Sequence, residues 1–326
     1  MPRRFRPVDP FPPPKLRPVD KPPNPWFARG VTTECPPLML AAADWQARAA
    51  RHRVRAERFT VPARQRKDRR LPHPVADFLF QYYPFPLSLL EQWHPGTGVA
   101  LEWQGTPKPP FADRHHVFTG GAVLADPTTL DEKECQRLRW IVELLEATAG
   151  RAPQFACHGL HEWAMVYQGA TVRHEKTLKL RLPQAEIDAM VESRPIRCSH
   201  HDAFRFFAPA ARPFNQLQPS LDTRHLMEQP GCLHANMDLY KWAAKAMPWC
   251  GSDLLLDCFE LAAALRDLDM RASPYDVSGW GLDPVPIETP EGRKTYEAEQ
   301  KHLASLAEPL RARLIAALGK TLAAAC

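Results

Sequence analysis

The side chains that could carry out chemistry are concentrated between Gln154 and Trp242. Three times in this stretch a cysteine lies close to a histidine, and each pair precedes a run with helical character. The three runs are CHGLHE at 157–162, CSHHD at 198–202 and CLH at 232–234. Histidine titrates near neutral pH and ligates metal ions, so imidazoles brought together form a candidate reaction site. We therefore expect three helix starts that converge on one pocket.

Carboxylates accompany these imidazoles and add a second group suited to acid–base chemistry. The predicted catalytic side chains are Glu162, Asp202, Asp238, His161, His200 and His234. The alternative is a metal site, in which His161, His200 and His234 bind zinc or non-haem iron together with Glu162 or Asp202. The chain contains no H-E-x-x-H motif, so such a site needs ligands from distant segments.

Helices must position most of these residues, because helix signals dominate the chain. The pattern TLDE at 129–132 predicts a capped helix to about Ala149, and Ser252 begins an apolar helix to about Met270. Thr289, followed by a proline and an acid, is the N-cap of a long C-terminal helix. Short strands are expected at 99–103, 116–124 and 177–182. The predicted fold is a mainly helical α+β domain with a small sheet over residues 38–326.

The N-terminal quarter carries an excess of positive charge. Residues 1–72 hold 17 Lys and Arg against 6 Asp and Glu, whereas the remaining residues hold 25 against 31. Residues 1–37 contain 12 prolines and form a predicted disordered or extended tail that cannot bury a core. A helix is expected from Leu38 to about Phe59, broken at Pro62.

Cations this dense suit the phosphates of a nucleic acid, although a solvated helix face is the simpler explanation. The predicted nucleic-acid contacts are Arg51, Arg55, Arg58, Arg64, Arg66, Lys67, Arg69, Arg70, Arg205 and Arg212.

Cysteine usage and hydropathy limit the class of protein. The eight cysteines include no C-x-x-C pair, which leaves a zinc ribbon or a thioredoxin-type motif without support. No apolar run is long enough to cross a bilayer, and no secretory signal is recognisable. We therefore expect a cytoplasmic protein with reduced thiols and no membrane partner. The sequence does not predict an oligomeric state.

Several runs in the last three quarters of the chain resemble a bacterial protein family labelled 3-methyladenine DNA glycosylase. They are HPVADFLF at 73–80, LHEWAM at 160–165, CSH at 198–200, DAFRFF at 202–207, EQPGCLH at 228–234, DLYKW at 238–242 and DMRASPYD at 269–276. The resemblance implies excision of alkylated purines from DNA by hydrolysis of the N-glycosidic bond. On this hypothesis we expect damaged double-stranded DNA as the partner and no cofactor. The chain has neither a helix-hairpin-helix before a catalytic aspartate nor the zinc-snap pattern of small bacterial 3-methyladenine enzymes.

Excision by this route requires the base to leave the DNA stack and lie against an aromatic surface. An alkylated purine already carries positive charge, so a carboxylate beside the sugar is the main catalytic requirement. The side chains expected to stack on the base are Trp163, Tyr167, Tyr240 and Trp242. Two other hypotheses stay open: a metal-dependent enzyme acting on a nucleic acid or nucleotide, and a non-enzymatic nucleic-acid-binding adaptor.

Overall fold

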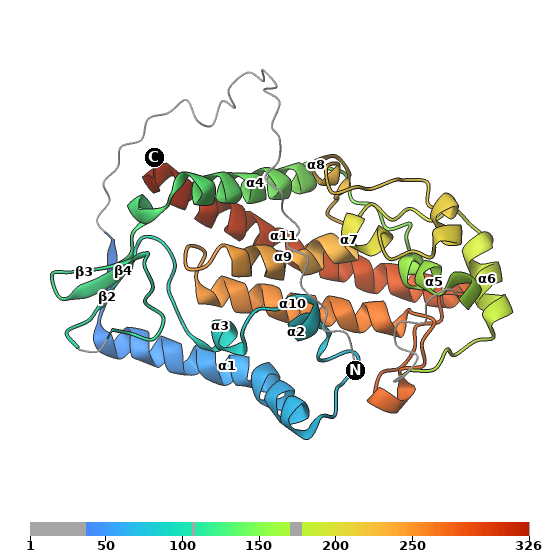
Figure 1. Cartoon of the computed structure of the whole chain (residues 1–326), viewed down its shortest axis with the longest axis horizontal. Coiled ribbons are helices and arrows are strands. Elements are labelled where there is room, and N and C mark those ends of the chain that lie inside the picture. Colours follow the sequence, from blue (N-terminus) through green and yellow to red (C-terminus); the bar gives the residue numbers. More distant parts are fainter. Residues whose placement is uncertain (1–36, 106–107, 170–177, 326) are drawn as a thin grey trace, which may run out of the picture. The chain divides into compact units, whose positions relative to one another are not determined.

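The computed structural model describes residues 37–105, 108–169 and 178–325. The predicted tail, residues 1–37, lies outside this range except for Pro37. Residues 37–326 form one unit, drawn in Figure 1. Its elements in chain order are β1 (Leu38–Leu40), α1 (Ala42–Arg69), α2 (Phe78–Tyr82), α3 (Leu87–Glu91), β2 (Val99–Glu102), β3 (His116–Thr119), β4 (Ala122–Ala125), η2 (Pro127–Thr129), α4 (Glu132–Ala149), α5 (Leu160–Met165), η3 (Tyr167–Gly169), α6 (Gln184–Glu192), α7 (His201–Phe204), η4 (Pro209–Phe214), α8 (Arg224–Met227), α9 (Leu233–Lys245), α10 (Ser252–Arg271), η5 (Ser278–Trp280) and α11 (Pro290–Ala325). The predicted mainly helical α+β class is confirmed.

Four strands form one mixed sheet in the order β1-β2-β4-β3. β1 pairs parallel with β2, and the other two pairings are antiparallel. The single strand expected at 116–124 is a hairpin instead, because Gly120 and Gly121 adopt φ angles of +58° and +77° that allow a tight turn. One face of the sheet packs Leu101 and Val123 against Trp45 in a small core of its own.

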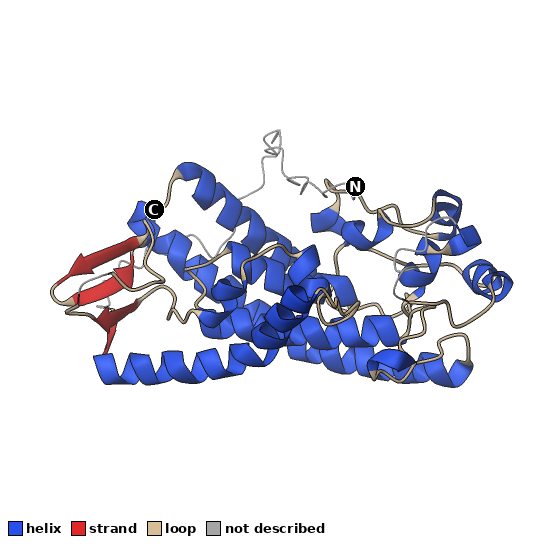
Figure 2. Cartoon of the chain, turned by 60° about the horizontal axis from the view of Figure 1, so that its bottom comes forward, coloured by secondary structure: helices blue, strands red, loops and turns tan. Residues whose placement is uncertain are grey.

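The main core lies between four long helices. α9 packs on α10, and α11 contacts α4, α9 and α10, so these helices lie side by side (Figures 1 and 2). Each buries an apolar face; in α4 the buried positions Leu138, Ile141 and Leu145 recur every three or four residues. Burial of these faces stabilises the helices far more than their intrinsic propensity does.

The helix boundaries follow local capping chemistry. Asp131 accepts a hydrogen bond from the Glu134 N–H, and the Glu134 side chain accepts one from the Asp131 N–H. The capping box of α4 therefore uses these two residues rather than Thr129. The predicted cap of α11 is confirmed, because the Thr289 hydroxyl accepts the Gly292 N–H at 3.0 Å.

Helix α1 continues through Pro62 to Arg69, so the predicted break at Pro62 is wrong. A proline inside a helix removes one hydrogen bond, here the bond to the carbonyl of Arg58. Because Arg58 is exposed, water can satisfy that carbonyl. The helix is kinked and then continues instead of ending (Figure 1).

Two further expectations concern segments beyond the sheet. In the described part of the strand expected at 177–182, only an isolated bridge between Leu180 and Tyr275 is present. Among the described residues, no helix is both long enough and apolar enough to cross a lipid bilayer.

Candidate functional site

The three Cys/His clusters open three helices, as the sequence predicts. His161 lies in the first turn of α5, His200 is the N-cap of α7, and His234 lies in the first turn of α9. The ring centroids of His161 and His234 are 4.6 Å apart, and those of His200 and His234 are 5.6 Å apart. Segments distant in sequence thus bring their imidazoles together. His161 and His200 are buried, whereas His234 is half-buried.

A glutamine side chain ties the segment before α5 to the start of α9. The Gln229 Oε1 accepts the N–H groups of Gln154 at 2.8 Å and Gly231 at 2.7 Å. Its Nε2 donates to the Gln154 carbonyl at 3.0 Å. A Cβ on Gly231 would lie 2.7 Å from that carbonyl oxygen, so only glycine fits this close approach. The first and third clusters therefore meet through backbone contacts as well as through their rings.

His161, Glu162, Arg266 and Asp269 form one buried group, which we call the Asp269 cluster. The His161 Nε2 is 2.6 Å from the Asp269 Oδ1. The Arg266 Nη1 donates to the Asp269 Oδ2 at 2.6 Å and to the Glu162 Oε1 at 3.0 Å. On the other side of the imidazole, the Cys157 Sγ is 3.4 Å from the His161 Nδ1. Arg266 and Asp269 are three residues apart on α10 and so present their side chains to α5 together.

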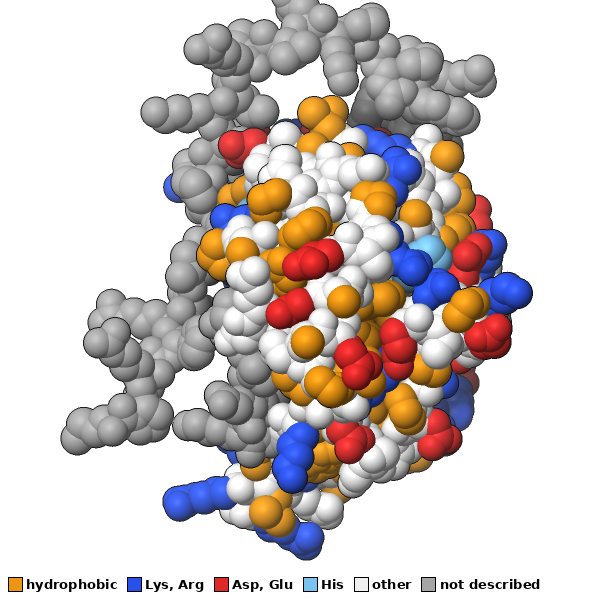
Figure 3. Space-filling view, turned by 90° about the vertical axis from the view of Figure 1, so that its right-hand side faces the viewer, with side chains coloured by type: hydrophobic (Ala, Val, Ile, Leu, Met, Phe, Trp, Pro, Cys, Tyr) orange, Lys and Arg blue, Asp and Glu red, His pale blue; other side chains and the backbone are white. Residues whose placement is uncertain are grey.

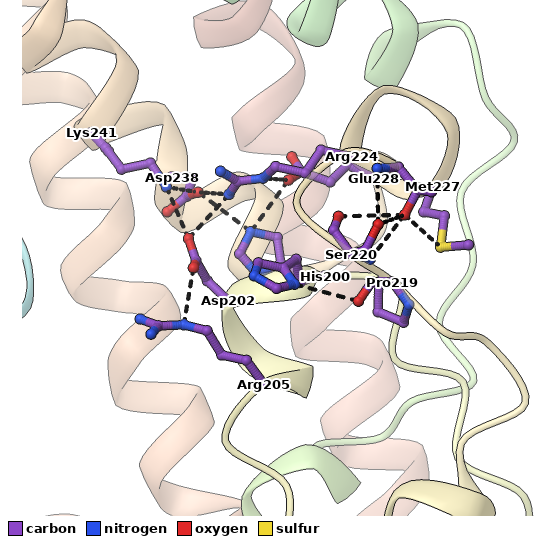
Figure 4. A network of polar contacts seen from close by, with 12 residues as sticks. His200, Asp202, Arg205, Pro219, Ser220, Arg224, Met227, Glu228, Asp238 and Lys241 are labelled. Carbon is purple, nitrogen blue, oxygen red and sulfur yellow. Dashed lines mark hydrogen bonds and ion pairs between the residues drawn. The ribbon is translucent and has the colours of Figure 1, made fainter. Parts of the chain in front are cut away.

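A second buried group surrounds Asp238 (Figure 4). The Asp238 cluster contains three acids and three cations around His200: Asp202, Glu228, Asp238, Arg205, Arg224 and Lys241. Arg224 donates through Nε to Glu228 at 2.7 Å. Its Nη2 donates to Asp202 and Asp238 at 3.1 Å each. The guanidinium thus contacts every acid of the cluster.

The remaining contacts close the Asp238 cluster. Lys241 donates to Asp202 and Asp238, and the Arg205 Nε pairs with Asp202 at 3.1 Å. The Tyr83 hydroxyl donates to the Asp238 Oδ1 at 2.6 Å. The His200 Nε2 lies 3.3 Å from the Asp238 Oδ2. Asp238 therefore has several partners and is fully enclosed.

The two clusters differ in their charge balance. In the Asp238 cluster, three carboxylates face three cations. Burial alone would raise the pKa of Asp238, but Lys241 and His200 outweigh burial and hold the pKa well below its usual range. Burial is likewise outweighed at Asp202, whose pKa is lowered by Lys241 and Arg224. Both aspartates are therefore ionised at neutral pH.

In the Asp269 cluster, two carboxylates face a single guanidinium. Burial favours neutral His161, but the carboxylate of Asp269 outweighs burial and raises the pKa of His161 well above its ordinary value. Protonated His161 then supplies the missing positive charge. Burial, together with the charge of His161, lowers the pKa of His234 to about 3. His234 is therefore neutral at pH 7 and keeps a lone pair for a ligand.

The predicted metal ligands are only partly brought together. Within the described residues, one group of three places a ligand atom from each member within 4.8 Å of the others: His161, His234 and Asp269. His200 does not belong to it, because its Nε2 faces the acids of the Asp238 cluster. Asp269 and Arg266 were not predicted as site residues. Their sequence signal is an acid and a cation spaced i, i+3 on an otherwise apolar helix face.

The four aromatic side chains predicted to stack on a base lie in the core. Trp163 is 0% exposed, Tyr240 and Trp242 are each 1% exposed, and Tyr167 is 4% exposed. The Trp163 indole donates to the Ala272 carbonyl at 2.9 Å, which fixes α5 against the end of α10. A base can reach none of these rings without opening the core. The stacking prediction is therefore wrong for this conformation.

The predicted phosphate-binding cations divide into two groups. Four of them are already in ion pairs with acids: Arg55, Arg64, Arg66 and Arg205. Five cations of the α1 segment are exposed and form no ion pair with any residue in the described ranges: Arg51, Arg58, Lys67, Arg69 and Arg70. Arg212 is exposed and donates to the Arg205 carbonyl at 3.3 Å. The face drawn in Figure 3, in contrast, carries both basic and acidic side chains.

A cavity of about 390 Å³ lies between α1, the segment around α2, α10 and η5. Its lining residues are Phe59, His73, Val75, Ala76, Leu79, Phe259, Glu260, Ala263, Ala264, Arg266, Asp267, Trp280 and Leu282. The rings of His73 and Trp280 are 4.7 Å apart. Arg266 belongs both to the lining of this cavity and to the Asp269 cluster, and its Nε has no hydrogen-bond partner among the described residues. We call this cavity the Arg266 cavity.

A second cavity, of about 370 Å³, lies beside α11 and includes Arg313 and Lys320. The three clustered histidines line neither cavity. Comparisons of the chain with protein-family models, with curated proteins and with solved structures find no match. The residues and their geometry are therefore the basis for a functional proposal.

Proposed function

We propose that the protein excises alkylated bases from duplex DNA, with the DNA phosphates on α1 and the extruded base in the Arg266 cavity. The observation that carries this proposal is that α1 and the Arg266 cavity are adjacent. α1 contributes Phe59 to the cavity wall, and the preceding residue, Arg58, is an exposed cation without an ion pair to any described residue. A phosphate held at Arg58 would therefore lie close to the cavity that receives the base.

The Arg266 cavity has the composition of a site for a planar heterocycle. Its volume falls in the usual range for small-molecule sites, which is about 300–1,000 Å³. Phe59, Phe259 and Trp280 offer aromatic surface. Arg266 lines the cavity, and its buried Nε–H has no hydrogen-bond partner among the described residues. Apolar walls with a few polar groups are typical of pockets that hold an extruded base.

Asp267 is the carboxylate best placed to act in this cavity. It is half-buried and forms no hydrogen bond or ion pair with another described residue. Burial raises its pKa, and Arg271 and His73 partly offset that effect. The three predicted carboxylates, in contrast, are held in ion pairs: Glu162, Asp202 and Asp238. We therefore assign the catalytic role to Asp267.

The reaction at Asp267 is hydrolysis. A water molecule attacks C1′ of the deoxyribose and gives a proton to the Asp267 carboxylate. The N-glycosidic bond breaks, and the alkylated base leaves with the bonding electron pair, which neutralises its positive charge. The carboxylate also stabilises the oxocarbenium-like sugar in the transition state.

The test is release of free base from duplex DNA treated with a methylating agent, measured by chromatography. We expect the wild-type protein to release methylated purines. Asp267→Asn should slow release by about 100-fold or more, the lower range for a lost acid–base group. Asp283→Asn is the matched control, because it makes the same charge change at an exposed residue near the cavity residue Leu282.

Two results would contradict the proposal. Wild-type protein that releases no base from the methylated duplex is not a glycosylase for these lesions, and binding of the duplex without release would favour the adaptor hypothesis. Equal rates of base release for Asp267→Asn and wild type would show that Asp267 takes no part in the reaction. Circular dichroism of each variant separates loss of activity from loss of fold.

A further inference from the structure

His161, His234 and Asp269 approach one another, and the inward atoms of His161 and Asp269 are paired with each other. The His161 Nε2 and the Asp269 Oδ1 are 2.6 Å apart, and the ring of His234 stands edge-on to that of His161 at 4.6 Å. A ligand atom from each residue lies within 4.8 Å of the other two. Two imidazoles and one carboxylate are the donors that first-row transition metals take in many catalytic sites.

The other polar atoms of His161 and Asp269 already contact neighbouring side chains. The His161 Nδ1 contacts the Cys157 Sγ at 3.4 Å, which leaves Nε2 to face inward. The Asp269 Oδ2 accepts from Arg266 at 2.6 Å, which leaves Oδ1 to face inward. Outer partners of this kind orient metal ligands and are a regular part of metal sites.

His234 provides the most direct indication of a ligand. Its imidazole makes no hydrogen bond to any residue in the described ranges, although it lies between two other histidine rings. An imidazole that is partly exposed and has no protein partner is open to water or to a bound ion. A bound ion would satisfy the ring nitrogen. Because His234 is half-exposed, it also gives the ion and a water molecule a route from solvent.

The charge of the Asp269 cluster favours the same conclusion. Asp269 and Glu162 are two acids that share one cation, Arg266, and burial together with the charge of Asp269 raises the pKa of Glu162. A buried group with an excess negative charge is costly unless a cation joins it. A proton on His161 is one such cation, and a divalent ion between the three ligands is another.

We propose that His161, His234 and Asp269 bind one divalent transition-metal ion of the Zn²⁺ and Fe²⁺ class, with at least one position left for water on the His234 side. The two imidazoles select against Mg²⁺ and Ca²⁺, which prefer oxygen ligands. Cys157 and Arg266 act as outer partners that orient His161 and Asp269. An ion here would lower the pKa of its bound water and so supply a nucleophile.

The test is titration of untagged, chelator-treated protein with Co²⁺, followed by displacement with Zn²⁺. We expect one equivalent of Co²⁺ to bind, with visible absorption typical of nitrogen and oxygen ligands, and Zn²⁺ to abolish that absorption. His234→Ala should weaken Co²⁺ binding by about 100-fold or more, and Cys157→Ala by about 10-fold, because loss of an outer partner typically costs about 10–100-fold.

The matched control is His158→Ala. His158 belongs to the same segment as His161 but faces Glu297 at 3.6 Å, so its removal should leave the affinity unchanged. Asp269→Asn is the more direct ligand variant, although Asp269 is fully buried and its replacement endangers the fold. His234 is half-buried, so His234→Ala should fold, and circular dichroism checks this. Zn²⁺ should raise the Tm of the wild type but not that of His234→Ala.

The proposal is overturned if chelator-treated wild-type protein takes up no Co²⁺ at micromolar concentrations. It is also overturned if His234→Ala binds Co²⁺ as tightly as His158→Ala does, since the ion would then lie elsewhere. In either case a protonated His161 remains as the cation of the Asp269 cluster, and the cluster is a structural ion pair.

Discussion

The Asp238 cluster and the Asp269 cluster both have buried acids at their centre but differ in how their charges are matched. In the Asp238 cluster, three acids face three cations. Asp238 by itself accepts three hydrogen bonds, from Tyr83, Arg224 and Lys241. In the second, two acids meet one guanidinium, and a neighbouring histidine has no hydrogen bond to any described residue. The acids of the Asp238 cluster are matched by cations, although the buried His200 Nδ1 has no hydrogen-bond partner among the described residues, whereas the Asp269 cluster has fewer cations than acids. Burial of titratable groups is therefore not enough to identify a reaction site.

The first prediction concerns stability, where the difference should be largest. Asp238→Ala removes the acceptor shared by Arg224 and Lys241, and Arg224 is 3% exposed. Removing one partner of a buried ionic group typically costs about 3–5 kcal/mol, because the other charge remains buried. We expect a loss of this size in the free energy of unfolding, measured by urea denaturation.

Arg205→Met is the control for this measurement. Arg205 pairs with the same cluster through Asp202, but its side chain is 45% exposed. Exposed ion pairs contribute about 0–1 kcal/mol, so the change should be small. Equal costs for Asp238→Ala and Arg205→Met would show that the cluster is not the closed structural unit described here.

The second prediction is that the two clusters respond to acid in different pH ranges. The folded pKa of His234 is about 3, below the ordinary value near 6.5. Between these values the unfolded chain binds more protons, so stability should fall as the pH falls through this range. His234→Gln should flatten that part of the curve. Asp202 and Asp238 have lowered pKa values, so their stabilisation is complete above about pH 4 and is lost below it.

The measurement is the urea midpoint as a function of pH, in the presence of a chelator, for wild type, His234→Gln and Asp202→Asn. Asp202→Asn should flatten the curve only below about pH 4. His161 acts in the opposite direction to His234: its raised pKa gives stability that is present below about 6.5 and is lost as the pH rises through the folded value. If both variants altered the same pH range, the two clusters would not titrate separately.

The third prediction, with the smallest expected effect, concerns DNA binding by α1. It compares the cations of α1 that have no acidic partner with those that form ion pairs. Arg51, Arg58 and Arg69 are exposed and form no ion pair with the described residues. Replacing all three by Gln should reduce the slope of log affinity for duplex DNA against log salt by about 0.9 for each phosphate that the helix no longer neutralises. Binding is measured by fluorescence anisotropy at several salt concentrations.

A second triple variant separates phosphate binding from net charge. Arg53, Arg55 and Arg64 are paired with Glu57, Glu260 and Glu91. Their replacement by Gln makes the same change in net charge but removes cations that are already neutralised. We expect a smaller change in slope. Equal slopes for the two triple variants would mean that only the net charge of the helix matters.

The fold class and the three helix starts could be predicted because their signals are local. A cap such as Thr289, or a cysteine and histidine before an apolar run, acts within a few residues. The convergence of the three histidines was expected from the same pattern. The partner of His161 was not, because Asp269 lies 108 residues away and meets it only when α10 packs against α5. Burial of the stacking candidates, such as Trp163, depends on the same packing.

The continuation of α1 past Pro62 is a second feature that could not be predicted from the sequence. Proline usually ends a helix, and the expected end before Pro62 followed from that rule. The helix continues because neighbouring elements hold α1 along its length, through the ion pairs of Arg55 with α10 and of Arg66 with Asp77. Tertiary interactions of this kind outweigh the loss of a single hydrogen bond, and they cannot be read from the residues next to the proline.

The helices α5, α7 and α8 have six, four and four residues, lengths at which an isolated peptide in water has no stable helix. Each is held to a long neighbour by one polar side chain: α5 to α10 by the buried His161, α7 to α9 by the half-buried Asp202, and α8 to α9 by the buried Arg224. Unfolding of such a turn would break the ion pair that its side chain forms with the long helix. We therefore expect the amide protons of these short turns to exchange with solvent almost as slowly as those of the helices that anchor them.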